Sequence, residues 1–378
     1  MAEVNNNNNT HAILRQPNAD DAEEILLSDA DLEELSVTEP KLKAKKASEP
    51  STEVAEAMKE VHKAIDQVKT GIDGIANSEF LRPLHESGII SADFKAVSGN
   101  EEGSVEGVME NMPYYAVTIN GGKEDANDDA FLIDPSTNTV IVMDGLGGYE
   151  GGFVASTLAA YRAAKILEKS RYGIFHPDLK KMLRLMHETI LEFQNKNPNF
   201  QEMGATAVIA HQRDIEHVEF VHAGDSRAMV IRNGKKVFST KDDNYLQVYM
   251  EKNKDKIETE EQARAALGEM LYKKYRSMVT QSLGVGNTDT ETFKQNRESV
   301  IANFEKYDTQ KGDIVVLCSD GVTDNLTNEE ILGLFMEQIE MGKSLKKAVE
   351  KVKEVTYKIM GFQGGKADNI VIAAYIVE

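Results

Sequence analysis

The stretch VIVMDGLGGYEGG, from Val140 to Gly152, runs four apolar residues into one acid, Asp144, and then places five glycines in eight positions. The apolar run is short and rich in β-branched residues, which predicts a buried strand. An Asp-Gly pair after a strand usually forms a turn. Glycine also lets backbone and water come close to neighbouring groups. Asp144 therefore either turns the chain or supplies a carboxylate to a site at the rim of a sheet.

Further short apolar runs, bounded by Gly, Asn or Asp, follow one another from Pro113 to the C-terminus and predict more strands. They are YYAVTI, AFLIDP, GATAVIA, HVEFVHAG, RAMVIR, KKVFST, DIVVLCSDG and DNIVIAAYIV. Asn233-Gly234 lies between two of them and predicts a hairpin turn. Apolar spacing of three and four predicts helices over 153–170 and 177–195. Further helical stretches are expected over 244–278, which is highly charged, and over 328–358. Strands in sequence interrupted by helix pairs indicate an α+β layered domain, with antiparallel sheets inside and helices outside.

The N-terminal third has a different composition. Residues 1–50 contain an Asn run and acidic clusters, which predict a disordered acidic region. Residues 51–77 carry apolar side chains spaced alternately by four and three, the pattern of a heptad helix. This helix either docks on its own domain or forms a dimeric coiled coil. Residues 78–112 are expected to be a linker or an N-terminal extension of the domain.

The bulk composition excludes several classes of protein. The chain has 378 residues, a formal net charge of −20 and one cysteine, Cys318. The single cysteine excludes an internal disulfide framework and a Cys-rich metal cage. The negative charge argues against binding to nucleic acid or to an anionic membrane surface. The sequence has no apolar run of membrane-spanning length and no signal-peptide pattern, so we expect a cytoplasmic protein.

The sequence contains incomplete forms of three known motifs, two based on glycine and one on cysteine, and each lacks a required residue. A dinucleotide-binding loop starting at Gly145 requires a third glycine where the chain has Glu150. A phosphate-binding loop that ends in Gly342-Lys343-Ser344 requires its first glycine where the chain has Glu337. Cys318 lacks the arginine six residues later that a cysteine phosphatase needs, because that residue is Asp324.

What remains is a set of acids that share a placement beside the ends of predicted strands: Asp128, Asp129, Asp144, Asp320 and Asp368. Carboxylates that converge in this way repel one another unless a cation lies among them, and hard divalent ions prefer oxygen ligands. Gly145 and Gly321 directly follow two of the acids and would let backbone and water approach an ion. The placement therefore favours a divalent-cation site at the rim of a sheet over isolated turns.

Six blocks of the sequence resemble, in order, the motifs of the metal-dependent protein serine/threonine phosphatases of type 2C (the PPM family). The blocks are NDDAF (127–131), VMDGLGGYEGG, GATAV (204–208), AGDSRA (223–228), LCSDGVTD and ADNI. The resemblance covers about residues 113–378. It implies a four-layer α/β/β/α sandwich in which 244–278 is a flap-like insertion. It also implies hydrolysis of phosphoserine and phosphothreonine in proteins by a water activated by two Mg²⁺ or Mn²⁺ ions, without a phosphoenzyme.

The resemblance assigns roles to particular residues. The metal ligands would be Asp128, Asp144, the Gly145 carbonyl, Asp320 and Asp368, with Asp144 bridging both ions and Asp128 holding the second. Asp129, Asp324 and Asn369 would lie behind these ligands, and the two acids would orient water. Asp225 and Arg227 of the GDSR block are interpreted as structural residues.

The chain also departs from the family pattern at three places. The family usually has an arginine that holds the phosphate before the NDD block, and the nearest base here is Lys123. A histidine proposed to protonate the leaving group is replaced by Tyr149. The acid expected for a third metal ion before the GATAV block is not evident, since Asn199, Gln201 and Glu202 occupy that neighbourhood.

Two functional hypotheses follow. The first is an active phosphatase in signalling, whose partner is a phosphorylated protein. The second is a pseudophosphatase that acts as a binding or scaffold protein, with partner binding or self-association through 51–77. The flap-like insertion is expected either to select substrates or to be a solvated excursion of the chain.

Overall fold

The structure is a computed structural model that describes residues 90–91, 102–121, 127–147, 151–171, 176–290, 292, 294–362 and 365–378. All of these belong to a compact unit that runs from Thr52 to Glu378. The predicted disordered region 1–50, the predicted heptad helix 51–77, Lys123 and Tyr149 lie outside the described residues.

Two six-stranded sheets form the centre of this unit, and every strand pair in them is antiparallel. The first sheet has the order β1 (Ile90–Ser91), β4 (Ala130–Asp134), β5 (Thr139–Met143), β8 (Ala207–Asp214), β9 (His217–Ala223) and β15 (Asn303–Asp308). The second has the order β11 (Lys235–Ser239), β10 (Arg227–Arg232), β16 (Ile314–Cys318), β17 (Ile370–Ile376), β3 (Met112–Ile119) and β2 (Glu102–Met109).

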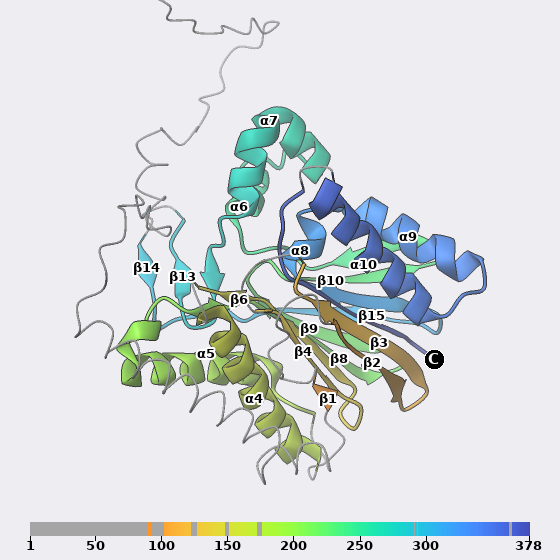
Figure 1. The fold of residues 1–378 in the computed structure, drawn as a ribbon, viewed down its shortest axis with the longest axis horizontal. Coiled ribbons are helices and arrows are strands. Elements are labelled where there is room, and N and C mark those ends of the chain that lie inside the picture. The colour runs from red at the N-terminus through yellow and green to blue at the C-terminus, as the bar shows by residue number, and fades with distance from the viewer. Residues whose placement is uncertain are drawn as a thin grey trace, which may run out of the picture. The chain divides into compact units, whose positions relative to one another are not determined.

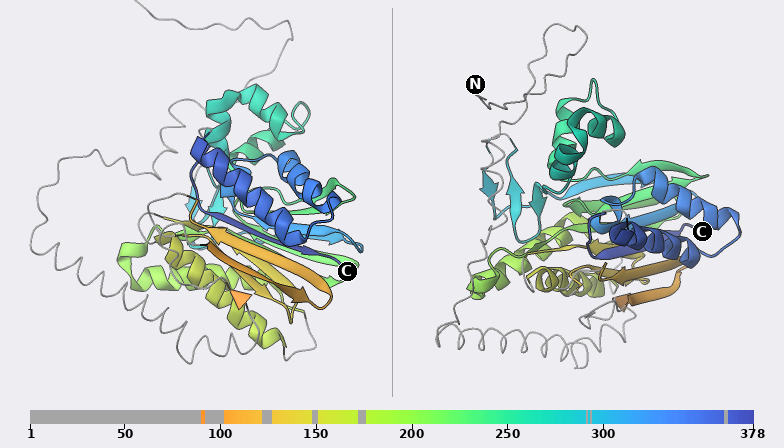
Figure 2. Two further views of the ribbon diagram at one scale, coloured as in Figure 1. Left: turned by 45° about the vertical axis from the view of Figure 1, so that its right-hand side comes forward. Right: turned by 45° about the horizontal axis from the view of Figure 1, so that its top comes forward.

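Helix pairs cover the outer faces of both sheets. α4 (Gly151–Arg171) and α5 (Leu179–Lys196) lie on the first sheet, and α9 (Asn328–Glu340) and α10 (Leu345–Phe362) lie on the second (Figures 1 and 2). The expected four-layer α/β/β/α sandwich is therefore confirmed.

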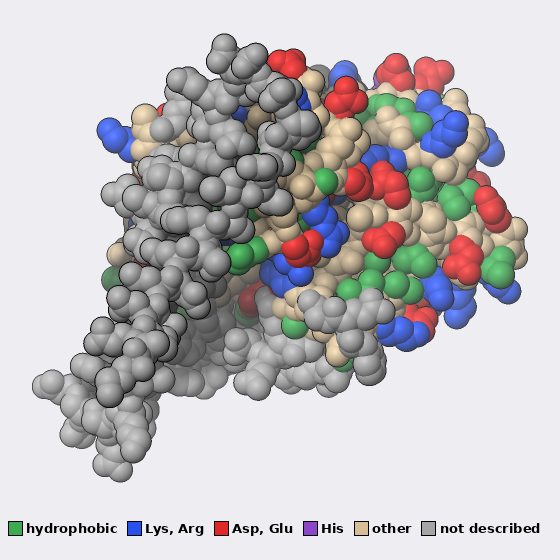
Figure 3. Space-filling view, turned by 90° about the horizontal axis from the view of Figure 1, so that it is seen from above, with side chains coloured by type: hydrophobic (Ala, Val, Ile, Leu, Met, Phe, Trp, Pro, Cys, Tyr) green, Lys and Arg blue, Asp and Glu red, His purple; other side chains and the backbone are tan. Residues whose placement is uncertain are grey.

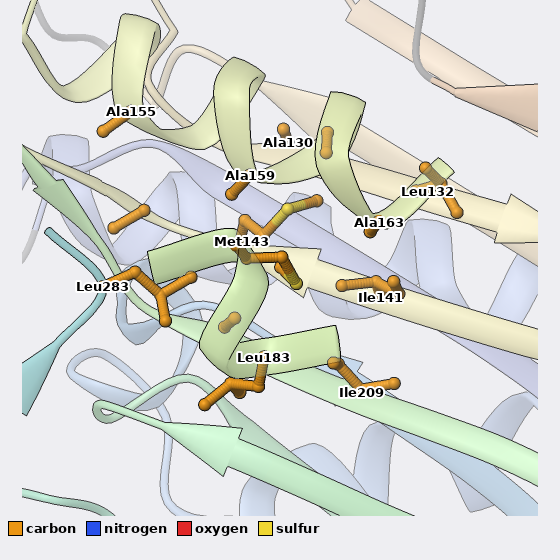
Figure 4. Close-up of a cluster of buried hydrophobic side chains, with 14 of the residues drawn as sticks. Ala130, Leu132, Ile141, Met143, Ala155, Ala159, Ala163, Leu183, Ile209 and Leu283 are labelled. Atoms are coloured by element: carbon orange, nitrogen blue, oxygen red, sulfur yellow. The ribbon is translucent and has the colours of Figure 1, made fainter. Parts of the chain in front are cut away.

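The inner strands β4, β5, β16 and β17 are mostly apolar because they are buried on both faces. In β5, Ile141 and Met143 face the helices α4 and α5, whereas Val140 and Val142 face the second sheet. Between α4 and the sheet, three alanines spaced by four residues share one face of the helix. Figure 4 shows these small side chains, Ala155, Ala159 and Ala163, beside the sheet residues Ile141 and Met143. A third core joins the second sheet to α9 and α10.

The structure corrects the helix predicted over 328–358, which is two helices. Thr327 caps α9 with a reciprocal side-chain and backbone pair, and Gly342, with a φ of 70°, follows its end. The chain then reverses into α10. The predicted hairpin is confirmed, since Asn233 and Gly234 have φ values of 50° and 72° between β10 and β11.

Smaller elements connect the layers. The insertion 244–278, expected to be one helical stretch, is also two helices, α6 (Tyr245–Lys252) and α7 (Glu260–Arg276). A three-stranded sheet follows, formed by β12 (Gln281–Ser282), β13 (Gly286–Thr288) and β14 (Gln295–Asn296). The remaining elements are β6 (Gly145–Leu146), which pairs with β7 (Gly204–Ala205), the 3-10 helix η2 (Pro198–Phe200) and α8 (Asp320–Thr323). None of the helices in the described ranges is both long and apolar enough to cross a membrane.

Candidate metal centre

The predicted acids of the first sheet lie at one end of adjacent strands. Asp144 follows β5, and Asp128 and Asp129 precede β4. The two strands are antiparallel and Ala130 pairs with Met143, so the end of one strand lies beside the start of the other. The register of a single hairpin therefore places all three acids at the same edge.

The second sheet repeats this arrangement. Asp320 comes two residues after the end of β16, and Asp368 comes two residues before β17. These strands are also antiparallel neighbours, with Cys318 opposite Ile372. Each sheet thus contributes acids from one strand exit and one strand entry.

Hydrogen bonds join the two sheets at this edge. The backbone N–H of Asp128 donates to Asn369 Oδ1 at 3.0 Å. The hydroxyl of Ser319 donates to Asp129 Oδ2 at 2.7 Å. Both bonds are buried and connect residues far apart in the chain, so the acids of the first sheet are positioned by the second.

Asp144 is held through its backbone by Thr206, a residue that the sequence did not single out, and Thr206 is itself bonded to Ser226. The carbonyl of Asp144 accepts from the Thr206 N–H at 2.8 Å, and its N–H donates to Thr206 Oγ1 at 3.3 Å. Thr206 Oγ1 in turn lies 2.6 Å from Ser226 Oγ. Thr206 is in the GATAV block and Ser226 is in the GDSR block. Those blocks were the available signal, and one residue from each contributes to the position of Asp144.

Glycine is required beside Asp144 because backbones approach closely there. A Cβ on Gly145 would lie 2.3 Å from the Gly152 carbonyl oxygen and 2.7 Å from the Asp128 carbonyl oxygen. A Cβ on Gly152 would meet both the Gly145 carbonyl oxygen, at 2.7 Å, and Asp128 Cγ, at 2.9 Å. The Gly145 carbonyl and the Asp128 side chain therefore converge on the same small space.

The clustered acids oppose one another's ionisation. Burial raises the pKa of Asp144 well above its ordinary value, and the negative charges of Asp129, Asp320 and Asp368 raise it further. Burial also raises the pKa of Asp320. A cation among these groups would relieve both effects, because it restores the favourable interaction that each ionised carboxylate loses on leaving water.

Among the described residues, Lys366 and Arg276 are basic residues that reach this edge, and the sequence pattern identified neither. Lys366 Nζ lies 2.8 Å from Asp320 Oδ2, 2.9 Å from Asp324 Oδ2 and 3.1 Å from Asp368 Oδ2. Arg276 Nε donates to Asp324 Oδ1 at 2.6 Å. Burial would raise the pKa of Asp324, but the charges of Arg276 and Lys366 outweigh it and lower that pKa. Asp324 is therefore an ionised acid paired with two cations.

The residues at this edge fit hard divalent ions in their chemistry. Carboxylates and one accessible carbonyl are the oxygen donors that Mg²⁺ and Mn²⁺ prefer. In the described ranges, no group of three or more acidic, histidine or cysteine side chains is arranged so that it could hold a metal ion. Lys366 instead takes an oxygen from each of three acids, two of which are predicted metal ligands.

Other predicted residues lie elsewhere. Burial raises the pKa of Cys318 to about 12, so this thiol is a core residue, as expected, and is not ionised at neutral pH. Gln201 and Glu202 are exposed in the turn after η2. A groove of about 840 Å³ runs along α10 and is lined by Tyr115, Lys346 and Lys351 among others. The clustered acids do not line it.

The fold and this edge define a two-sheet sandwich with a cluster of buried carboxylates where its sheets meet. The chain belongs to the protein phosphatase 2C family, whose model matches residues 121–355. It is 26% identical over 269 residues to the serine/threonine protein phosphatase PstP of Mycobacterium tuberculosis, covering 70% of this chain and 45% of PstP. It is 25% identical over 238 residues to a putative protein phosphatase of Mycoplasma genitalium, covering 60% of this chain and 82% of that protein.

Solved structures share the fold. The crystal structure of M. tuberculosis PstP/Ppp has a TM-score of 0.55 and 24% identity, covering 71% of this chain and 99% of that chain. The phosphatase Stp1 of Staphylococcus aureus has a TM-score of 0.54 and 20% identity, covering 72% of this chain and 97% of that chain. The chain spans less than half the length of the PstP sequence that it matches.

Proposed function

We propose that this chain hydrolyses phosphoserine and phosphothreonine in proteins and depends on two Mg²⁺ or Mn²⁺ ions. The observation that carries the proposal is the buried Asp144, set among Asp129, Asp320 and Asp368 at the shared edge of two sheets, in a member of the protein phosphatase 2C family. PstP, a relative, is a serine/threonine protein phosphatase. One solved structure of its catalytic domain contains two manganese ions.

The ions would be held by Asp128, Asp144, the Gly145 carbonyl, Asp320 and Asp368. When bound, they would neutralise these carboxylates and supply a water that is activated for attack on phosphorus. Thr206 and Ser226 fix the Asp144 backbone. Asn369 restrains Asp128, and Ser319 orients Asp129. This packing holds the ligands in place before substrate arrives, which lowers the reorganisation that the reaction requires.

Two substrate contacts belong to this proposal. Lys123 would hold the phosphate as a point charge in place of a bidentate arginine. Tyr149 would stand beside the leaving oxygen. A thiol nucleophile is disfavoured, because Cys318 is buried and its pKa is raised to about 12.

The test is hydrolysis of a phosphothreonine peptide by the full chain with Mn²⁺ or with EDTA. We expect turnover only with Mn²⁺, and a loss of about 100-fold or more in kcat for Asp144→Asn, the scale seen when one electrostatic contributor is removed. Asp255→Asn is a matched control, because Asp255 is an exposed acid outside the cluster. Equal turnover in EDTA, or no turnover by protein that binds Mn²⁺ in calorimetry, would refute the proposal. The second outcome would favour a binding role.

A further inference from the structure

Lys366 has an unusual position for a lysine. Its ammonium contacts one oxygen from each of Asp320, Asp324 and Asp368, at 2.8, 2.9 and 3.1 Å. The ammonium donates hydrogen bonds to Asp320 and Asp324 and forms an ion pair with Asp368. The three contacts place a positive charge inside the acid cluster at the edge of the second sheet.

The backbone of Lys366 is fixed as well. Its N–H donates to Asn325 Oδ1 at 3.0 Å, and its carbonyl accepts from Asn325 Nδ2 at 3.0 Å. Asn325 Nδ2 also donates to the carbonyl of Gly321 at 2.8 Å. Asn325 therefore ties the start of the Lys366 side chain to α8, the helix that begins with Asp320.

The far end of the side chain can leave the cluster. The Lys366 side chain is 43% exposed, whereas the Asp320 and Asp368 side chains are 14% and 10% exposed. Rotation about the four-carbon stem can therefore carry the ammonium into solvent without moving the acids. The backbone of Lys366 is thus fixed, whereas its side chain is partly exposed.

We propose that Lys366 is a tethered cation that competes with one divalent ion for Asp320 and Asp368 and thereby sets the affinity of that site. The inference rests on the metal-binding part of the proposed function. An ion that takes both carboxylates must displace the ammonium or bind beside it, and like charges at that range repel. Either way the presence of Lys366 weakens binding of the ion. Free enzyme would thus keep its acids paired at low metal concentration and become loaded only as the concentration rises.

The experiment is Mn²⁺ titration of the metal-free full chain by calorimetry, with free Mn²⁺ followed by electron paramagnetic resonance. For Lys366→Gln we expect the Mn²⁺ dissociation constant of the weaker site to fall about 10-fold. For Lys366→Arg we expect this constant to stay within about twofold of wild type, because the positive charge is kept. Lys358→Gln is the matched control, because Lys358 is an exposed lysine paired with Glu354 on α10. It should titrate like wild type.

Thermal unfolding gives a second measurement. In EDTA, Lys366→Gln should melt at a lower temperature than wild type, because three acids lose their cation. Added Mn²⁺ should raise the melting temperature of Lys366→Gln by more than it raises that of wild type. If that variant fails to fold without metal, Asn325→Ala keeps the ammonium but releases its tether and should tighten Mn²⁺ binding by a smaller factor. If Lys366→Gln and Asn325→Ala both fold and bind Mn²⁺ as well as wild type or more weakly, the inference is overturned. The same result is expected if Lys366 contacts only the phosphate of the substrate. Neither measurement depends on turnover, so a lack of phosphatase activity would leave this result separate.

Discussion

Surroundings, more than residue type, decide which side chains here carry charge. Asp144 and Asp324 belong to the same cluster, yet burial and neighbouring acids raise the pKa of Asp144, whereas Arg276 and Lys366 lower the pKa of Asp324. The same principle applies to His211, in the core of the first sheet. Burial, followed by the nearby His176, lowers the pKa of His211 to about 4.

His211 leads to a prediction about stability and pH. Its imidazole is 2% exposed and contacts Thr139 Oγ1 at 3.1 Å and His176 Nδ1 at 3.0 Å. The unfolded chain has a histidine pKa of about 6.5. The stabilising contribution of neutral His211 is therefore complete above pH 6.5 and is lost as the pH falls from 6.5 towards 4, where the unfolded state binds the proton more readily.

We expect the free energy of unfolding of the wild type to fall across this range, with up to about 3 kcal/mol of the fall due to His211. His211→Asn should be less stable than wild type at pH 7 but should lose less on acidification. Urea unfolding in EDTA at pH 7, 5.5 and 4.5 measures this. The exposed His217→Asn is the control. Parallel pH curves for His211→Asn and wild type would show that the histidine is protonated without penalty.

Among the secondary-structure elements, α7 has the least ordinary construction. Its first residue, Glu260, contacts its last residue, Arg276, at 2.7 Å, although 16 residues separate them. A straight helix would hold them about 24 Å apart. Gly268, with a φ of 73°, interrupts the helical backbone and lets the two halves fold back (Figure 1). The insertion is thus a helical hairpin closed at its base.

Ion pairs join the closed base to the acid cluster at the edge of the sheets. Arg276 links Glu260 to Asp324, and Glu260 Oε1 also accepts from Arg227 Nη2 at 2.9 Å. Arg227 is bound through two nitrogens to Asp242, at 3.0 and 2.6 Å. This supports the structural role expected of Arg227. It also argues against a loosely attached excursion, while a role of the hairpin in substrate choice stays a prediction.

Breaking the ion pairs of Arg276 should loosen the helical hairpin formed by α7. Arg276→Gln leaves Asp324 and Glu260 short of a buried partner, so we expect a loss of roughly 3 kcal/mol in the free energy of unfolding. Faster hydrogen exchange in α7 should accompany it. Lys273→Gln is the matched control on the same helix, since its pair with Glu269 is exposed and contributes less than about 1 kcal/mol. Equal losses for both variants would contradict the anchoring role of Arg276.

For the molecule as a whole, the excess of acidic residues in the sequence does not make the surface uniformly acidic. The net charge is −20, yet acidic and basic side chains are interspersed on the face viewed in Figure 3. Several acids are instead buried at the shared edge of the sheets, among them Asp128, Asp144 and Asp368. Part of the negative charge is thus buried in the acid cluster and is not exposed to solvent.

The extent of the described fold predicts the effect of truncation. All described strands and helices lie after residue 89, and the family match begins at residue 121. We therefore expect a chain that starts at residue 78 to retain Mn²⁺-dependent turnover of p-nitrophenyl phosphate within about twofold of the full chain. The measurement is kcat/KM for both proteins. A large loss in a truncated protein with unchanged thermal unfolding would assign the segment 1–77 to the site or its activation.

Much of the architecture was predictable because its causes are local. Strands buried on both faces are apolar at every position, and the acids stand out at their ends, so β4, β5, β16 and β17 could be placed from pattern. β2 could not: its run EGSVEGVM alternates with glycine and acids, and only pairing with β3 makes it a strand. The division between α9 and α10 was also missed, because a brief Met-Gly-Lys-Ser link interrupts one amphipathic pattern.

The amino-acid order was sufficient for the layers of the sandwich and the acids of its edge, because strand burial and strand ends depend on neighbours in the chain. The contacts that tune those acids required the folded molecule. Lys366 meets Asp320 across 46 residues, Arg276 meets Asp324 across 48, and Ser319 meets Asp129 across 190. The local sequence around one residue of each pair does not identify the other residue. Each pair forms because two sheets and a folded-back helix bring distant segments to one edge.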